Sequence, residues 1–187
     1  MVPSSRQLAL TALLPLLLAC GGIVDPDLTT GEVSGALTNA QPGAYAYVLG
    51  APATKAPVVN GAFRLQHAPV GNVQVVIYDG ASKAEALAVQ VKPASRAALS
   101  RDAADMPLAG SIVPVPRCGG GGSGVGVHFT VEGTDLQDVV LDAGKPLYPL
   151  PAGQYSLRGT LAGYVSAAKD VKVEAGAEAP EELALDV

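Results

Sequence analysis

Short runs of alternating apolar and polar positions, separated by turn residues, fill most of this 187-residue chain. Val73, Val75 and Ile77 occupy every second position of one run, which places their side chains on one face of a strand. No long apolar stripe with helical spacing follows residue 30. The candidate strands of the first half are Gly31–Leu37, Ala44–Leu49, Ala62–Gln66, Asn72–Tyr78 and Ala84–Lys92. The pattern therefore predicts an all-β fold from residue 31 onward.

Clusters of Gly, Pro, Asn and Asp separate these runs, as expected for turns. The turn signals are Gln41-Pro42-Gly43, Asn60-Gly61, Pro69-Val70-Gly71-Asn72 and Asp79-Gly80. One segment is ambiguous, because the alanine-rich stretch from residue 84 to residue 99 is also compatible with a turn or two of helix. Val89 and Val91 alternate with polar neighbours and Pro93 ends the run, which favours a strand.

The second half of the chain repeats this plan 82 residues later. A shift of 82 carries Leu65 onto Leu147, Pro69 onto Pro151, Gly71 onto Gly153, Val89 onto Val171, Val91 onto Val173, and Tyr45–Leu49 onto Val127–Val131. Few of the paired residues are identical, so chance in a Val- and Gly-rich chain is the alternative. The constant offset favours a true repeat, which predicts two small domains at residues 31–108 and 109–187.

Several of these landmarks resemble the carboxypeptidase regulatory-like domain. In the first half they are Gly31-Glu32-Val33-Ser34-Gly35, Phe63-Arg64-Leu65, Pro69-Val70-Gly71 and Val73-Gln74-Val75. In the second half they are Leu147, Pro151-Ala152-Gly153, Tyr155-Ser156-Leu157-Arg158 and Gly163-Tyr164. The second opening, Gly110-Ser111-Ile112-Val113-Pro114, lacks the second glycine. The resemblance implies two tandem, small antiparallel β-sandwiches of the prealbumin (transthyretin) type.

Two packed sheets of this kind need one apolar face on each strand. The expected core residues are Val33, Tyr47, Leu49, Phe63, Leu65, Val73, Val75, Val89 and Val91, and then Phe129, Val131, Leu147, Tyr155, Leu157, Val171 and Val173. The family's name refers to an appendage beside a zinc peptidase domain, so the resemblance implies no enzyme activity.

Residues 1–22 have the order of an export signal. Arg6 supplies the positive charge, Leu8–Leu18 is the apolar run, and small Ala19 precedes Cys20. A spanning helix would need roughly 20 apolar residues, and a plain secretory signal would not need the cysteine. The segment resembles the lipobox of bacterial lipoproteins. That resemblance implies cleavage between Ala19 and Cys20, acyl chains on Cys20, and a signal peptide at residues 1–19.

The lipidated cysteine and a polar tether would then form residues 20–30. In the sorting rule known for enteric bacteria, Asp after the lipidated cysteine retains a lipoprotein at the inner membrane. Gly21 stands there instead, which favours the outer membrane of a bacterial envelope. Ten extended residues reach at most about 35 Å, so the first domain is expected close to the membrane.

Charge and composition limit the kinds of partner that the chain is expected to bind. The chain has 12 Lys and Arg against 17 Asp and Glu, a formal net charge of −5. An acidic chain without Lys/Arg clusters is not expected to bind nucleic acid. Membrane attachment is expected to rest on the acyl chains of Cys20. Once Cys20 is lipidated, the mature chain holds no internal disulfide, and Cys118 is either a reduced thiol or an intermolecular link.

The chain offers little that resembles a catalytic or metal site. His67 and His128 are not spaced as zinc ligands, which predicts no metal, and nothing indicates a cofactor. Serines lack a nucleophile-elbow pattern, and the pairs Asp102/Asp105 and Glu181/Glu182 read as solvated charges. The glycine run after Arg117 lacks the Lys-Ser/Thr of a phosphate-binding loop, which predicts a surface loop. An unrecognised hydrolase remains as an alternative, and calcium binding by a loop stays open.

Together these observations predict a non-enzymatic, membrane-anchored envelope lipoprotein that acts as a structural or protein-interaction module, with an envelope protein as partner. The alternative is a surface lipoprotein that binds carbohydrate through a β-sandwich face or loops. Glycan-binding faces commonly use exposed aromatic side chains. The candidate ligand platform for this alternative comprises Tyr45, Tyr78, Tyr148 and Tyr164.

Overall fold

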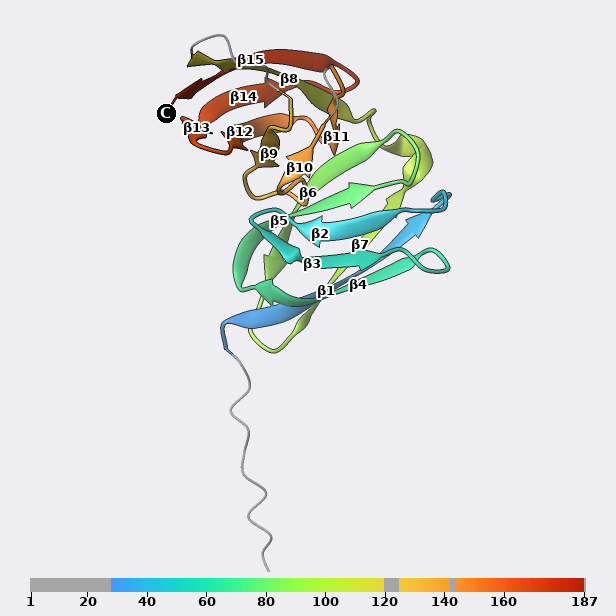
Figure 1. Cartoon of the computed structure of the whole chain (residues 1–187). Helices are drawn as coiled ribbons and strands as arrows, with labels where there is room; N and C mark the ends of the chain where they lie inside the picture. Colours follow the sequence, from blue (N-terminus) through green and yellow to red (C-terminus); the bar gives the residue numbers. More distant parts are fainter. Residues whose placement is uncertain (1–27, 120–124, 142–143, 187) are drawn as a thin grey trace, which may run out of the picture.

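The computed structural model describes residues 28–119, 125–141 and 144–186. The described residues are almost entirely strands and turns, which confirms the all-β prediction. Strands β1–β7 form a first unit and strands β8–β15 a second unit above it (Figure 1). Residues 1–22, with the expected cleavage and lipidation site at Ala19 and Cys20, lie outside the described residues.

The first unit contains two sheets. Its strands are β1 (Thr30–Thr38), β2 (Tyr45–Val48), β3 (Ala51–Pro57), β4 (Ala62–Pro69), β5 (Gly71–Tyr78), β6 (Ala84–Val91) and β7 (Arg96–Asp102), followed by the 3-10 turn η1 (Ala103–Asp105). One sheet has the order β4-β1-β7 and the other β3-β2-β5-β6. The Asn60-Gly61 turn lies between β3 and β4, where φ angles of 51° and 74° fit the left-handed conformation that a tight hairpin needs.

The second unit forms one eight-stranded sheet. Its strands are β8 (Gly110–Cys118), β9 (His128–Val131), β10 (Val139–Val140), β11 (Leu147–Leu150), β12 (Gly153–Leu161), β13 (Tyr164–Ser166), β14 (Lys169–Val173) and β15 (Glu178–Asp186). The order is β10-β9-β12-β13-β15-β8-β11, and β14 pairs with β12. The short β13 bridges β12 and β15, so it joins two layers that are separate sheets in the first unit.

Strand pairing follows the same scheme in both units. β1 lies between antiparallel β4 and parallel β7, as β8 lies between antiparallel β11 and parallel β15. β5 pairs with β2 and β6, as β12 pairs with β9 and β14. The parallel pairs differ from the antiparallel sandwiches expected from sequence, because the chain crosses from one layer to the other before β7 and before β15.

The register gives the exact correspondence between the units. Gly71 pairs with Val91 and Gly153 with Val173, so β5 and β12 differ by 82 residues. Val33 pairs with Leu65 and Ile112 with Leu147, which makes the offset 79 for β1 and β8. Val48 pairs with Val75 and Val131 with Leu157, which makes it 83 for β2 and β9. The loops around β8 and β9 absorb these differences.

The sequence pattern did not predict two strands of the first unit, β3 and β7. β3 carries Pro52 and Pro57 among small residues, and it lies at the edge of its sheet, where a missing N–H is tolerated. β7 was not separated from the alanine-rich stretch before it. It pairs with β1, which is more than 60 residues earlier in the chain, so no local signal defines it.

Each unit has its own apolar core. The first includes Val33, Leu37, Ala46, Val48, Phe63, Leu65, Val75, Ile77 and Val91. The second includes Ile112, Phe129, Val131, Leu147, Leu150, Tyr155, Leu157, Val171, Val173, Leu183 and Leu185. Tyr47 is buried as expected, although it belongs to neither cluster. One expectation for the first core was wrong, because Leu49 packs against the second core.

Candidate functional site

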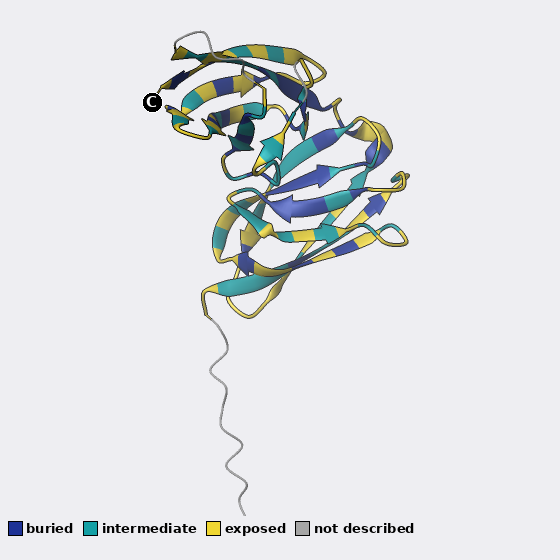
Figure 2. Ribbon diagram, in the orientation of Figure 1, coloured by how far each residue is buried: buried dark blue, intermediate teal, exposed yellow. Residues whose placement is uncertain are grey.

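The sheet β3-β2-β5-β6 is covered on both faces. Ala46 and Val48 of β2 point into the first core, so the alternating side chains Tyr45 and Tyr47 point to the opposite face. Tyr47 is only 1% exposed there, and β2 and the Val75–Ile77 part of β5 are buried (Figure 2). A sheet face turned away from its own core is buried only where something else covers it, and here the second unit does so.

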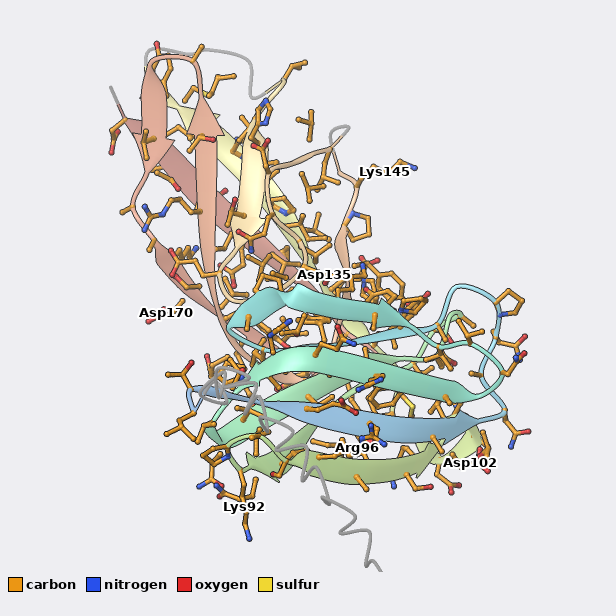
Figure 3. The ribbon with its side chains drawn as sticks, turned by 90° about the horizontal axis from the view of Figure 1, so that it is seen from below. Lys92, Arg96, Asp102, Asp135, Lys145 and Asp170 are labelled. Atoms are coloured by element: carbon orange, nitrogen blue, oxygen red, sulfur yellow. The ribbon has the colours of Figure 1, made fainter. Side chains whose placement is uncertain are left out.

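The loop after β9 forms this cover. The N–H of Gly50 donates to the carbonyl oxygen of Gly133 at 2.7 Å. The ammonium group of Lys55 pairs with the carboxylate of Asp135, whose side chain is 8% exposed. Figure 3 labels Asp135 where the two units meet. We call this contact the seam, and it joins β2, β3 and β5 of the first unit to the loop after β9 and to β11 of the second unit.

Three of the four tyrosines predicted as a ligand platform gather along the seam. The ring centroids of Tyr45 and Tyr78 are 5.3 Å apart, and those of Tyr78 and Tyr148 are 6.3 Å apart at an interplanar angle of 88°. The ammonium nitrogen of Lys55 lies 3.7 Å from the centroid of Tyr45, a cation–π distance. The hydroxyl groups of Tyr78 and Tyr148 both donate to the carbonyl oxygen of Ala81. Tyr148 therefore connects the units.

The surroundings of the seam keep its tyrosines neutral. Burial raises the pKa of Tyr45 and of Tyr47 well above the ordinary value, and the carboxylate of Asp135 raises both further. Burial also raises the pKa of Tyr78 and of Tyr148. Neutral phenols pack against one another without charge repulsion, which suits a permanent contact.

The fourth predicted platform residue lies elsewhere. Tyr164 belongs to β13 and packs against the core of the second unit. Tyr148 is 37% exposed, whereas Tyr45 and Tyr78 are half-buried. The structure thus brings Tyr45, Tyr78 and Tyr148 together as a contact between the units, and Tyr148 is partly open to solvent. Sequence reasoning missed Asp135 and Lys55, because 80 residues separate them.

The remaining candidate residues are scattered. His128 on β9 donates its Nδ1–H to the carboxylate of Asp138 at 2.8 Å. His67 lies near the end of β4 with a φ of 55°. Cys118 ends β8 against the second core. Asp102 caps η1 by accepting from the N–H of Ala104. Within the described ranges, no three His, Cys, Asp or Glu side chains are grouped so that they could hold a metal ion.

A polar pocket lies at the end of the first unit where the described chain begins. It has a volume of about 610 Å³ and is lined by Thr30, Gly31, Glu32, Arg64, Gln66, His67, Ala94, Ser95 and Arg96. Glu32 forms ion pairs with both Arg64 and Arg96. The hydrogen bond from Arg64 is the main cause that lowers the pKa of Glu32, and Arg96 lowers it further. The two arginines neutralise the single carboxylate and leave this end net positive.

Comparisons with known proteins do not assign the chain to a family. No family model and no curated protein matches the chain. Among solved structures, the Bacillus anthracis TIE protein is similar at 16% identity, with a TM-score of 0.33. The match covers 84% of this chain and 34% of that protein. In the residues that the structure describes, no helix is long and apolar enough to cross a membrane.

Proposed function

We propose that this protein is a non-enzymatic envelope lipoprotein, in which two prealbumin-like β-sandwiches form one rigid structural or protein-interaction module. The seam is the observation that carries the proposal. It buries Tyr47 and Asp135 and links the units through backbone, ionic and aromatic contacts. Two units joined in this way hold a fixed shape, which a spacer or scaffold needs.

The direction of the chain supports the anchoring part of the proposal. The described chain starts at one end of the first unit, and the second unit lies on the far side (Figure 1). With acyl chains on Cys20 and a tether of about ten residues, the first unit stands within about 35 Å of the membrane. The second unit then faces away from the surface and is the part displayed to a partner.

The common strand pairing supports the tandem part. Two halves with the same neighbours and the same parallel closing strand are most simply two copies of one sandwich. The carbohydrate-binding alternative requires tyrosines that are open to a glycan. Three of the candidates instead use their rings in the seam, which favours the interaction module.

The decisive experiment replaces the residue expected to carry the lipid. In the producing bacterium, Cys20→Ser is expected to abolish incorporation of labelled fatty acid and to move the protein out of the membrane fraction. Cys118→Ser is the matched control and should keep both. A Cys20→Ser chain that is still acylated and membrane-bound would refute the anchor. A glycan array probed with residues 21–187, which retain both cores, separates the alternative function, and we expect no binding.

A further inference from the structure

An apolar pocket opens in the second unit between β8 and the pair β9–β10. Its volume is about 560 Å³, within the range of small-molecule sites. The lining residues are Pro114, Val115, Pro116, Val125, Gly126, Phe129, Val140, Leu141, Gly144 and Lys145. Val125 and Val140 at its rim are 75% and 54% exposed. Lys145 is the single polar side chain among these residues.

At the corresponding place in the first unit, a side chain fills the space beside β1. β4 pairs with β1 as far as Ala36, and the ring of Phe63 lies over Gly35. A Cβ atom at Gly35 would be 2.1 Å from that ring. The offset of 82 that aligns Leu65 with Leu147 matches Phe63 with Lys145, which lies exposed just before β11. The second unit therefore lacks the side chain that fills this space in the first.

Strand β8, which lines the pocket, is paired with β11 over only part of its length. β11 pairs with β8 at Gly110 and Ile112, and within the described residues the rest of this edge of β8 has no strand partner. The N–H of Ser111 donates to Ala177, beside β15, so the N–H positions of the open edge belong to Pro114 and Pro116. Proline has no N–H to donate.

These prolines determine what the pocket can hold. An extended peptide that added a strand to β8 would find no donors from residues 114 and 116, so strand addition is disfavoured. A ligand must instead bind through apolar contact with the valine, leucine and proline walls. Every polar group that it buried against them would lose hydrogen bonds to water without replacement. The walls therefore select a ligand body without polar groups.

Lys145 adds one requirement. Among the lysines and arginines of the described ranges, only Lys92 and Lys145 make neither an ion pair nor a side-chain hydrogen bond. Figure 3 shows Lys145 projecting from the second unit, far from Lys92 at the opposite side of the view. An unpaired cation at the mouth of an apolar pocket attracts an anionic group at the end of the ligand.

We propose that this pocket binds a single acyl chain that ends in a carboxylate, a fatty acid. The chain lies against Pro114, Phe129 and Val140, and the carboxylate meets the ammonium group of Lys145 at the mouth. This inference concerns the second unit alone and does not depend on lipid attachment at Cys20. Its failure would leave the anchor and the seam untouched.

The test uses residues 21–187, which retain all residues of both cores, and isothermal titration with dodecanoate below its micelle concentration. Dodecanol, which has the same chain without the charge, is the matched ligand. The protein is expected to bind dodecanoate more tightly than dodecanol. Lys145→Met should weaken dodecanoate binding about tenfold, as expected for one lost charge-assisted contact, and leave dodecanol binding unchanged. Lys92→Met should change neither.

A second variant tests the walls of the pocket. Val140→Trp should abolish binding of both ligands by filling the groove, whereas Val165→Trp, at a 55% exposed valine on β13, should not. Absence of dodecanoate binding, equal binding of the two ligands, or a Val140→Trp variant that still binds would overturn the proposal. So would sedimentation showing a dimer that Val140→Trp dissociates, because a second copy would then occupy the groove.

Discussion

The two units share a strand plan but differ at the place where their sheets close. In the first, Phe63 covers Gly35 and seals the core. In the second, the offsets of the strands match these two positions with Lys145 and Pro114, and both residues line an apolar pocket. Because no ring lies above residue 114, this position has room for a side chain where the first unit has Gly35. Two units can thus share a scheme of strand pairing and differ in the chemistry of the space beside one strand.

The polar pocket is a second difference between the units, and here the first unit has the pocket whose residues lack counterparts in the second. Glu32 and Arg96, which pair across β1 and β7, correspond by register to Ser111 and Glu178 across β8 and β15. The ion pairs that line the pocket of the first unit therefore have no counterpart at these positions of the second. One unit carries a charged pocket near the start of the described chain, and the other an apolar pocket.

The largest expected effect comes from opening the first unit. Phe63→Ala removes a nearly buried ring above Gly35, and we expect a loss of about 3–5 kcal/mol in the free energy of unfolding, because the core cannot collapse into the space. Urea unfolding of residues 21–187 measures it. Lys145→Ala, at the corresponding exposed position, should change stability by less than about 0.5 kcal/mol. Similar losses in both variants would contradict the comparison.

The seam should respond less strongly. Lys55→Met leaves the carboxylate of Asp135 buried without its cation, and we expect a loss of about 1–2 kcal/mol, since the half-exposed ammonium group is partly screened by water. The double variant Lys55→Met/Asp135→Asn should recover part of that loss. Urea unfolding and protease resistance of the connection between the units report it. A Lys55→Met protein as stable as the parent would show that the ion pair does not hold the units together.

Closing the second unit should give a smaller gain. Lys145→Phe places a ring where Phe63 lies in the first unit, and filling the groove is expected to raise the free energy of unfolding by about 0.5–1 kcal/mol. The same change should abolish dodecanoate binding. The thermal midpoint and titration calorimetry measure the two effects. Lys92→Phe is the control and should produce neither. A destabilised Lys145→Phe variant would mean that the two positions are not equivalent.

The smallest expected effect is on the stability of the folded state at acidic pH. Because Arg64 and Arg96 lower the pKa of Glu32 below its ordinary value of 4.5, this carboxylate stabilises the folded state above that pH. The contribution is lost as the pH falls through the lowered pKa. Glu32→Gln should therefore flatten the acid limb of the stability profile without changing its alkaline limb. Hydrogen exchange on β1 and β8 localises the effect, and an equal change on β8 would contradict it.

Much of the fold was predictable from local pattern. The strands around Val33, Leu65 and Val75 and the Asn60-Gly61 turn lie where alternation and turn residues place them. Tyr47 shows the limit of the same reasoning. It alternates correctly with Val48, yet an apolar pattern cannot say whether the second face of a sheet meets water or another unit. Asp135 and Lys55 gave no signal, because neither residue is unusual until the loop after β9 reaches β3.

The sequence by itself determined most strands of the first unit and their inward faces, because side-chain alternation and turn preferences act over a few residues. It also placed Cys20 in its lipobox context, and the lipid there remains a prediction. Only the tertiary structure decided that three predicted platform tyrosines meet in a seam, and that Lys145 stands at the mouth of a pocket that Phe63 closes in the first unit. Both depend on the register between strands distant in the chain, which no local pattern encodes.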